Sequence, residues 1–194
     1  IYVFLFLVIA SACMLLFLSF LIFYCSFGAL FFAFIYPFMK RYTHLPQVFL
    51  GAAFSWSIPM AYTAVGEPLG LTCWLLYFGN LAWTVAYDTQ YAITDREDDL
   101  KIGVKSTAIL FGRFDIQIIA LLQAVSVILI GTALYLENLL FSFGLIALLV
   151  VVVDFIYQWS KTKDKDPQRC FWAFRHNRWV GLIIFAGIFL ELTI

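Results

Sequence analysis

The feature that most constrains this chain is a run of 39 residues before its first charged side chain, Lys40. Residues 45–66, 68–87 and 116–136 also contain no Asp, Glu, Lys or Arg. About 20 apolar residues in a helix cross the ~30 Å hydrocarbon core of a bilayer. Only helices and closed barrels satisfy their backbone groups in lipid, and these runs lack the alternation of barrel strands. The sequence therefore predicts an all-α, polytopic transmembrane helical bundle.

Composition narrows the class of protein further. Only 12% of the residues are charged, against roughly 25% in soluble domains. Twelve Lys and Arg balance twelve Asp and Glu, so no basic surplus is present to attract nucleic acid. The spacing of the four cysteines fits neither a disulfide framework nor a zinc site. We expect membrane lipid, and no nucleic acid, as a partner.

The hydrophobic runs divide into seven predicted spans within one membrane domain, residues 1–194. One helix over the first 39 residues would be about 58 Å long, so two spans joined by a turn near residues 19–21 fit better. The seven spans are expected at 1–18, 21–38, 47–65, 70–94, 113–135, 140–159 and 178–194.

Charge distribution predicts the orientation of these spans. Alternation places residues 39–46, 95–112 and 160–177 on one side of the membrane, and all twelve Lys and Arg lie in or beside these segments. Glu67 and Glu137 lie on the other side. By the positive-inside rule, the basic side is expected to be cytoplasmic.

Three carboxylates are the first candidate functional group. Asp88, Asp95 and Asp99 stand at i, i+7 and i+11, so on a helix they fall within about 40° of one another. Aligned carboxylates at membrane depth repel one another unless a cation lies among them. Mg²⁺ usually takes one or two carboxylates plus substrate phosphates, which suits Asp95 and Asp99. The alternative is a solvated helix end, although Asp88 lies too far inside the span for that.

Basic residues are the second candidate group. Lys40 and Arg41 end the second span, where both could simply snorkel to the interface. Functionally, Arg suits a carboxylate and Lys a phosphate. Lys101 and Lys105 follow the aspartates and are expected to add positive charge near a metal-bound diphosphate. The basic loop 160–178 is expected to face anionic lipid headgroups.

Three other polar residues receive no functional role from the sequence. His44 and His176 have no partner at metal-ligand spacing, so both are interpreted as surface residues. Asp154 follows four valines shortly before Lys161, and its role is interpreted as structural or incidental.

Two motifs resemble a known family. The segment YDTQYAITDREDDLKIGVKSTAILFG contains the pattern D-x-x-Y-A-x-x-D-x-x-x-D, and YPFMKRYTHLPQ precedes it. Together they resemble the UbiA superfamily of intramembrane prenyltransferases, over the whole chain. The greatest likeness is to its members that prenylate 4-hydroxybenzoate for ubiquinone biosynthesis.

The resemblance implies a nine-helix bundle whose active-site cavity opens toward the cytoplasm. Asp95 and Asp99 would bind Mg²⁺ and the diphosphate of a polyprenyl donor, with Asp88 and Tyr91 in the same motif. Lys40 and Arg41 would lie near the diphosphate and the aromatic acceptor. The implied catalytic residues are Asp88, Asp95, Asp99 and Arg41, and the implied substrate-binding residues are Lys40, Arg41, Tyr91, Lys101 and Lys105.

The implied reaction is an electrophilic aromatic substitution. Diphosphate leaves with the help of the metal, and the carbon ortho to the phenol of 4-hydroxybenzoate attacks the allylic cation. The implied location is the bacterial inner membrane, or the mitochondrial inner membrane with the site on the matrix side. Homogentisate, dihydroxynaphthoate and haem remain possible acceptors, and the sequence fixes neither prenyl chain length nor oligomeric state.

The chain departs from the family in one respect. Nothing in it matches the family's first motif, N-D-x-x-D-x-x-x-D, and it begins at Ile1. We therefore expect an N-terminally incomplete fragment, with seven spans of nine, that is inactive alone. Two rival interpretations are a transporter that uses intramembrane Asp88 and Asp154, and a complete, non-catalytic lipid-binding subunit.

Overall fold

A computed structural model describes residues 2–15, 17–18 and 20–194. All regular secondary structure within these ranges is helical, which confirms the predicted class. The helices are α1 (Tyr2–Leu15), α2 (Phe20–Tyr42), α3 (Pro46–Ser55), α4 (Ser57–Val65), α5 (Leu71–Ile102), α6 (Thr107–Phe111), the 3₁₀ turn η1 (Gly112–Phe114), α7 (Asp115–Leu136), α8 (Phe143–Thr162), α9 (Pro167–His176) and α10 (Arg178–Thr193).

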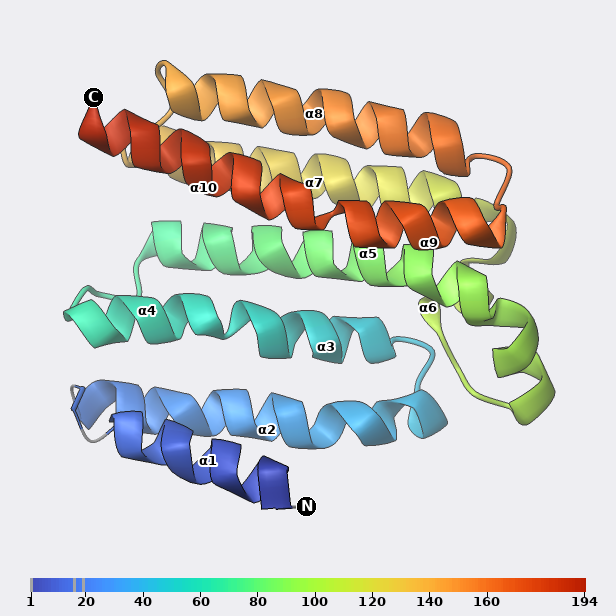
Figure 1. The fold of residues 1–194 in the computed structure, drawn as a ribbon, viewed down its shortest axis with the longest axis horizontal. Helices are drawn as coiled ribbons and strands as arrows, with labels where there is room; N and C mark the ends of the chain where they lie inside the picture. The colour runs from blue at the N-terminus through green and yellow to red at the C-terminus, as the bar shows by residue number, and fades with distance from the viewer. Residues whose placement is uncertain (1, 16, 19) are drawn as a thin grey trace.

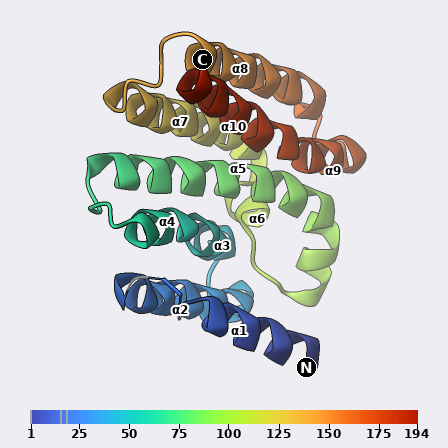
Figure 2. The same cartoon turned by 60° about the vertical axis from the view of Figure 1, so that its left-hand side comes forward.

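These helices run back and forth along one axis, in the order that the sequence predicts. Figure 1 shows α1, α2, the pair α3 and α4, α5, α7, α8, and the pair α9 and α10 as successive passes in alternating directions. Figure 2 shows the same arrangement from the side, with α5 between the N-terminal and C-terminal helices. Ser19, in the predicted first turn, lies outside the described residues.

Four helical segments of the described chain are long and apolar enough to cross a membrane. They are Phe20–Tyr42, Pro46–Val65, Thr107–Leu136 and Phe143–Thr162. Their side chains are largely exposed, as expected where lipid replaces water around the bundle. The chain is therefore an integral membrane protein.

The predicted third span is broken into two helices at Trp56. Pro59 lies four residues after Ser55, and a proline has no N–H to donate to the carbonyl four residues earlier. The hydrogen-bond ladder is interrupted there, so α3 ends at Ser55 and α4 begins at Ser57.

Helix α5 continues beyond the predicted end of the fourth span, residue 94, to Ile102. Its extension, residues 95–102, is mostly charged, and its Arg, Glu, Leu and Lys residues favour helix while its three Asp residues do not. Gly103 then stops the helix in the left-handed conformation, at φ 71°, as is usual at a helix C-terminus. The carboxylate motif consequently lies on one continuous helix.

The loop predicted at residues 160–177 also contains a helix, α9. Pro167 occupies its first turn, and the Asp166 carboxylate accepts a hydrogen bond from the Arg169 backbone N–H at 2.9 Å. An acidic N-cap followed by proline is a strong start signal for a helix. α9 brings its aromatic side chains against α5.

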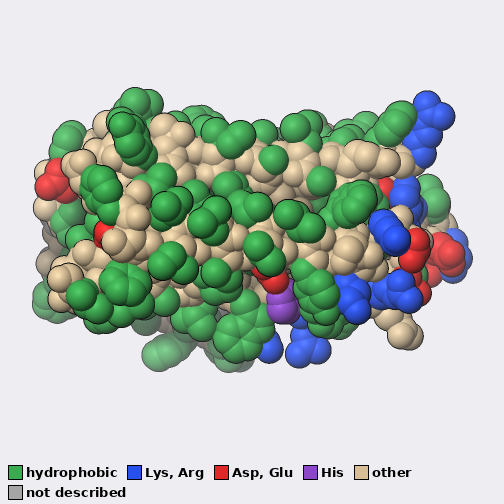
Figure 3. Space-filling view, turned by 90° about the horizontal axis from the view of Figure 1, so that it is seen from above, with side chains coloured by type: hydrophobic (Ala, Val, Ile, Leu, Met, Phe, Trp, Pro, Cys, Tyr) green, Lys and Arg blue, Asp and Glu red, His purple; other side chains and the backbone are tan. Residues whose placement is uncertain are grey.

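The basic side chains lie mainly at one end of the bundle. Figure 3 shows most Lys and Arg gathered at the end where α5 and α8 finish, while hydrophobic side chains cover much of the length between the ends. The predicted grouping of the basic segments is therefore confirmed.

Candidate functional site

Asp88, Asp95 and Asp99 lie along one stripe of α5, as predicted. The helix is continuous from Leu71 to Ile102, so the spacing of seven and four residues keeps the three on one face. The positive charge of Lys40, near the C-terminus of α2, acts on both Asp88 and Asp99. The structure thus brings the carboxylate stripe of α5 opposite the basic end of α2.

The environment of Asp99 favours a bound cation. Desolvation raises the pKa of its carboxyl above the ordinary value, and the negative charges of Asp95 and Asp98 raise it further, while Lys40 lowers it. Desolvation and like charges both penalise the ionised form. A positive ion next to Asp95 and Asp99 would relieve the repulsion between them.

Tyr91 connects the carboxylates to α9. Its phenolic hydroxyl lies close enough to Asp95 for that carboxylate to act on it directly. Its ring lies 5.0 Å from the ring of Phe174 and 6.3 Å from that of Phe171, between ring centroids. Phe174 also lies 6.0 Å from Tyr87. This aromatic cluster beside the stripe limits where the Tyr91 hydroxyl can point.

The two predicted basic residues of α2 lie in different surroundings. The backbone carbonyl of Lys40 accepts a hydrogen bond from the Lys105 N–H at 3.0 Å, and the Lys105 Nζ donates to the carbonyl of Tyr42 at 3.2 Å. Lys105 therefore ties the loop after α5 to the end of α2. Arg41 is exposed, and its guanidinium forms no hydrogen bond or ion pair with any other described residue. That guanidinium is accessible to an anion.

That Lys101 adds positive charge near a metal-bound diphosphate stays a prediction, and the structure gives Lys101 another partner. Lys101 follows Asp99 by two residues, which is about 200° around a helix. Its Nζ forms an exposed ion pair with Asp98 at 2.9 Å instead. Its charge points away from the stripe.

Asp95 and Asp99 fit a magnesium ion only if a second molecule, such as a diphosphate, supplies the remaining ligands. Among the described residues, no group of three or more His, Cys, Asp or Glu side chains converges on one point. Asp95 and Asp99 are one turn apart, at about 6 Å along the axis. Since Mg²⁺ commonly takes one or two carboxylates and completes its shell with phosphate oxygens and water, this pair suits a metal that arrives with a diphosphate.

A buried ion triad of Asp115, Arg96 and Lys165 holds α5 next to the carboxylate stripe, and the sequence did not predict it. Asp115, at the start of α7, is fully buried and pairs with Arg96 of α5 and, at 2.8 Å, with Lys165. Arg96 also donates to the carbonyl of Ala108 at 2.9 Å. Arg96 directly follows Asp95, so the triad fixes the rotation of α5 at the carboxylates.

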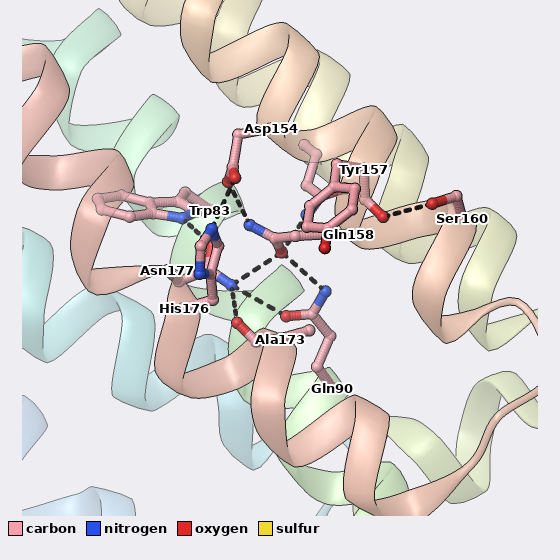
Figure 4. A network of polar contacts seen from close by, with 10 residues as sticks. Trp83, Gln90, Asp154, Tyr157, Gln158, Ser160, Ala173, His176 and Asn177 are labelled. Carbon is pink, nitrogen blue, oxygen red and sulfur yellow. Dashed lines mark hydrogen bonds and ion pairs between the residues drawn. The ribbon is translucent and has the colours of Figure 1, made fainter.

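A second missed feature is the amide network formed by Gln90, Gln123, Gln158 and Asn177 (Figure 4). Asp154 and His176 adjoin it and pair at 2.7 Å. The interpretation of His176 as an unpartnered surface residue is therefore wrong. Isolated amides inside apolar runs leave no periodic signal, so only the fold could bring them together.

An apolar cavity lies away from the carboxylates. It is a groove of about 540 Å³ between α7 and α8, with Val127, Phe155 and Trp159 among its lining residues. Its walls are almost entirely apolar, which suits hydrocarbon rather than the groups that react.

The fold and the stripe define a helical membrane protein with an acidic motif at the basic end of the bundle. The chain belongs to the UbiA prenyltransferase family, which it matches over residues 1–185. No solved structure matches the chain.

Curated relatives agree with this family. The chain is 79% identical over 188 residues to a 4-hydroxybenzoate octaprenyltransferase of Acinetobacter baylyi, covering 97% of this chain and 65% of that protein. It is 53% identical over 194 residues to the protein of that name from Pasteurella multocida, covering 98% and 67%. The Azotobacter vinelandii protein of that name is 55% identical over 172 residues, covering 87% and 57%. The chain thus spans between 57% and 67% of the length of these relatives.

Proposed function

We propose that the protein to which this chain belongs transfers a polyprenyl group to 4-hydroxybenzoate. The donor is a polyprenyl diphosphate, and the new bond forms at the ring carbon ortho to the hydroxyl, as a step of ubiquinone biosynthesis. The relatives named 4-hydroxybenzoate octaprenyltransferase support the substrates. The single structural observation that carries the proposal is the carboxylate stripe of α5 facing Lys40 of α2.

Asp95 and Asp99 would hold a divalent metal, proposed to be Mg²⁺, between the protein and the diphosphate. The metal supplies Lewis-acid stabilisation of the charge that develops on the leaving oxygen. Asp88 extends the same negative stripe into the bundle. Lys40, opposite the stripe, would bind diphosphate oxygens as a point charge. The carboxylates and Lys40 together hold the leaving group at the membrane edge.

The acceptor requires a different contact. The Arg41 guanidinium, beside Lys40, has no partner among the described residues, and a guanidinium binds a carboxylate through two parallel N–H groups. We assign it to the carboxylate of 4-hydroxybenzoate. Tyr91, whose hydroxyl lies close to Asp95, would orient the Asp95 carboxylate, and Lys105 holds the end of α2 in place.

The location follows from charge and family. The gathering of Lys and Arg at one end of the bundle favours a cytoplasmic or matrix position for that end, in a bacterial inner membrane or its mitochondrial counterpart. The polyprenyl chain would then remain among lipid and the aromatic acid would arrive from water.

The test uses the full-length protein in membranes with polyprenyl diphosphate, 4-hydroxybenzoate and Mg²⁺. Asp95→Ala and Asp99→Ala should each abolish transfer, because each removes a charged metal ligand. Asp98→Ala is the matched control, since Asp98 pairs with Lys101 on another face. Near-normal turnover by either ligand variant would contradict the proposal. Transfer to homogentisate or dihydroxynaphthoate but not 4-hydroxybenzoate would reassign the acceptor.

A further inference from the structure

The amide network joins four helices at one buried oxygen. Gln158 of α8 is completely buried, and its Oε1 accepts hydrogen bonds from Gln90 of α5 at 3.2 Å, from Gln123 of α7 at 3.4 Å and from Asn177 at 3.1 Å. Asn177 lies between α9 and α10. Buried amides are costly unless they are bonded, and apolar residues of similar volume could fill the same space. The arrangement therefore fixes position rather than merely filling the core.

Asp154 determines which way the central amide points. A glutamine side chain can exchange its oxygen and nitrogen by rotation, but an ionised carboxylate only accepts hydrogen bonds. Asp154 Oδ2 accepts from Gln158 Nε2 at 2.7 Å, so Gln158 Oε1 must face the three other amides (Figure 4). Asp154 Oδ1 contacts His176 Nε2 at 2.7 Å. The Asp154 carboxylate thereby orients the whole network.

The network leads from there to the carboxylate stripe. Asn177 bonds to Gln90 at 3.0 Å and to the carbonyl of Ala173 at 2.8 Å, which attaches the last turn of α9 to α5. Phe174 follows Ala173 and packs against Tyr91, the residue after Gln90. Tyr91, one turn before Asp95 on α5, presents its hydroxyl close to the Asp95 carboxylate.

We propose that Gln158 and Asn177 are positioning residues for the metal site: they lock α9 onto α5, so that Phe174 holds Tyr91 in the orientation that aligns Asp95. This inference rests on the proposed function, because it assigns Asp95 to the metal and diphosphate. In this arrangement Gln158 and Asn177 act through Phe174 and Tyr91 and not by contact with substrate.

The test moves the negative charge from Asp154 to position 158. Gln158→Glu alone places a second carboxylate against Asp154 and should disrupt the contact between α9 and α5. The double variant Asp154→Asn, Gln158→Glu restores every bond of the network. Its carboxylate at position 158 accepts from the three amides and from the amide nitrogen at position 154, and the amide oxygen at position 154 accepts from His176. Rescue by the double variant would not be expected from simple loss of packing.

Two measurements on the full-length protein in detergent decide the outcome. Hydrogen exchange of residues 167–176 reports whether α9 stays on α5. The Mg²⁺ concentration that half-saturates thermal stabilisation by inorganic pyrophosphate reports the metal site without catalysis. Gln158→Glu should speed the exchange and raise that concentration about tenfold, as is typical when groups that orient metal ligands are altered. The double variant should return both values close to those of the unaltered protein.

Phe174→Leu tests the last link if Gln158→Glu does not fold. It should leave the exchange of α8 unchanged while it raises the half-saturating Mg²⁺ concentration. The matched control is Glu191→Gln, whose carboxylate caps the opposite end of α8 by accepting from Phe143 N at 2.6 Å. It should lower stability without changing metal affinity.

Two results would overturn the inference. One is faster exchange in α9 with unchanged metal affinity in Gln158→Glu, which would make the network purely structural. The other is a double variant no better than Gln158→Glu. Failure of the proposed function appears separately, as absence of prenyl transfer by the unaltered protein.

Discussion

α2 and α5 face each other across the candidate site, but they are held in place very differently. α5 buries eleven residues in the bundle, whereas Ile22 is the one fully buried residue described in α2. The carboxylates of α5 are braced by the ion triad and the amide network. α2 is held by fewer contacts: Trp56 Nε1 donates a hydrogen bond to the carbonyl of Cys25 near its N-terminal end at 2.8 Å, and Lys105 bonds to its basic end.

This difference indicates that α5 and α2, the two walls of the candidate site, have different roles. Metal ligands need fixed geometry, because small displacements weaken coordination. A cationic wall that binds anions by charge tolerates more movement. We therefore expect the supports of α5 to control stability and the alignment of the carboxylates. Changes in α2 should mainly alter how substrates are bound.

The largest effect is expected where α5 is most firmly braced. Asp115→Ala leaves the Arg96 and Lys165 charges without their shared partner, and breaking such a buried pair costs about 3 kcal/mol of unfolding free energy. The matched control is Asp164→Ala, which removes an exposed pair with Arg169 at 3.2 Å and should cost at most about 0.5 kcal/mol. Denaturant titration of the full-length protein measures both. Equal losses would mean that the triad does not brace α5.

An intermediate effect is expected from Arg41→Lys on the α2 wall. Lys keeps the charge but cannot donate two parallel N–H groups, so the KM for 4-hydroxybenzoate should rise roughly ten- to a hundredfold. The KM for the polyprenyl diphosphate should change little. Arg113→Lys is the control at the same end of the bundle. A selective rise in the donor KM would move Arg41 to the diphosphate, and no change would remove it from the site.

The smallest effect is expected from Trp56→Phe. The substitution keeps an aromatic ring next to Phe32 and Tyr77 and removes one hydrogen bond to α2, which is worth about 1 kcal/mol. Hydrogen exchange should rise in residues 20–42 and stay constant in 71–102. Trp159→Phe is the control, since its exposed indole N–H makes no hydrogen bond to a described residue. Equal changes in α2 and α5 would refute the contrast between them.

The sequence predicted the path of the chain well because a bilayer imposes a simple rule. Long uncharged runs must become helices there, and the basic loops must share an end. Boundaries were less predictable at α5, because the run from Asp95 to Lys101 has the charge density of a solvated loop but is helical. The end of α5 depends on Gly103, whose left-handed conformation stops the helix.

The candidate site was only partly predictable. Asp88, Asp95 and Asp99 share one helix, so their spacing alone placed them on one face. Asp154 and His176 lie 22 residues apart on different helices, and Arg96 meets Asp115 only because α5 packs against α7. Such partners carry no local pattern. The pair of Lys101 with Asp98 depends on direction around the helix, which distance along the sequence does not give.

The length of α5 has a consequence for where two unlike substrates could meet. Its 32 residues extend about 48 Å, beyond the ~30 Å hydrocarbon core. The stripe from Asp88 to Asp99 covers about 16 Å of that length, so the single helix α5 reaches from the hydrocarbon core of the bilayer into water. A lipid-borne donor and a water-borne acid could each stay in the phase in which it dissolves and still react along the same helix.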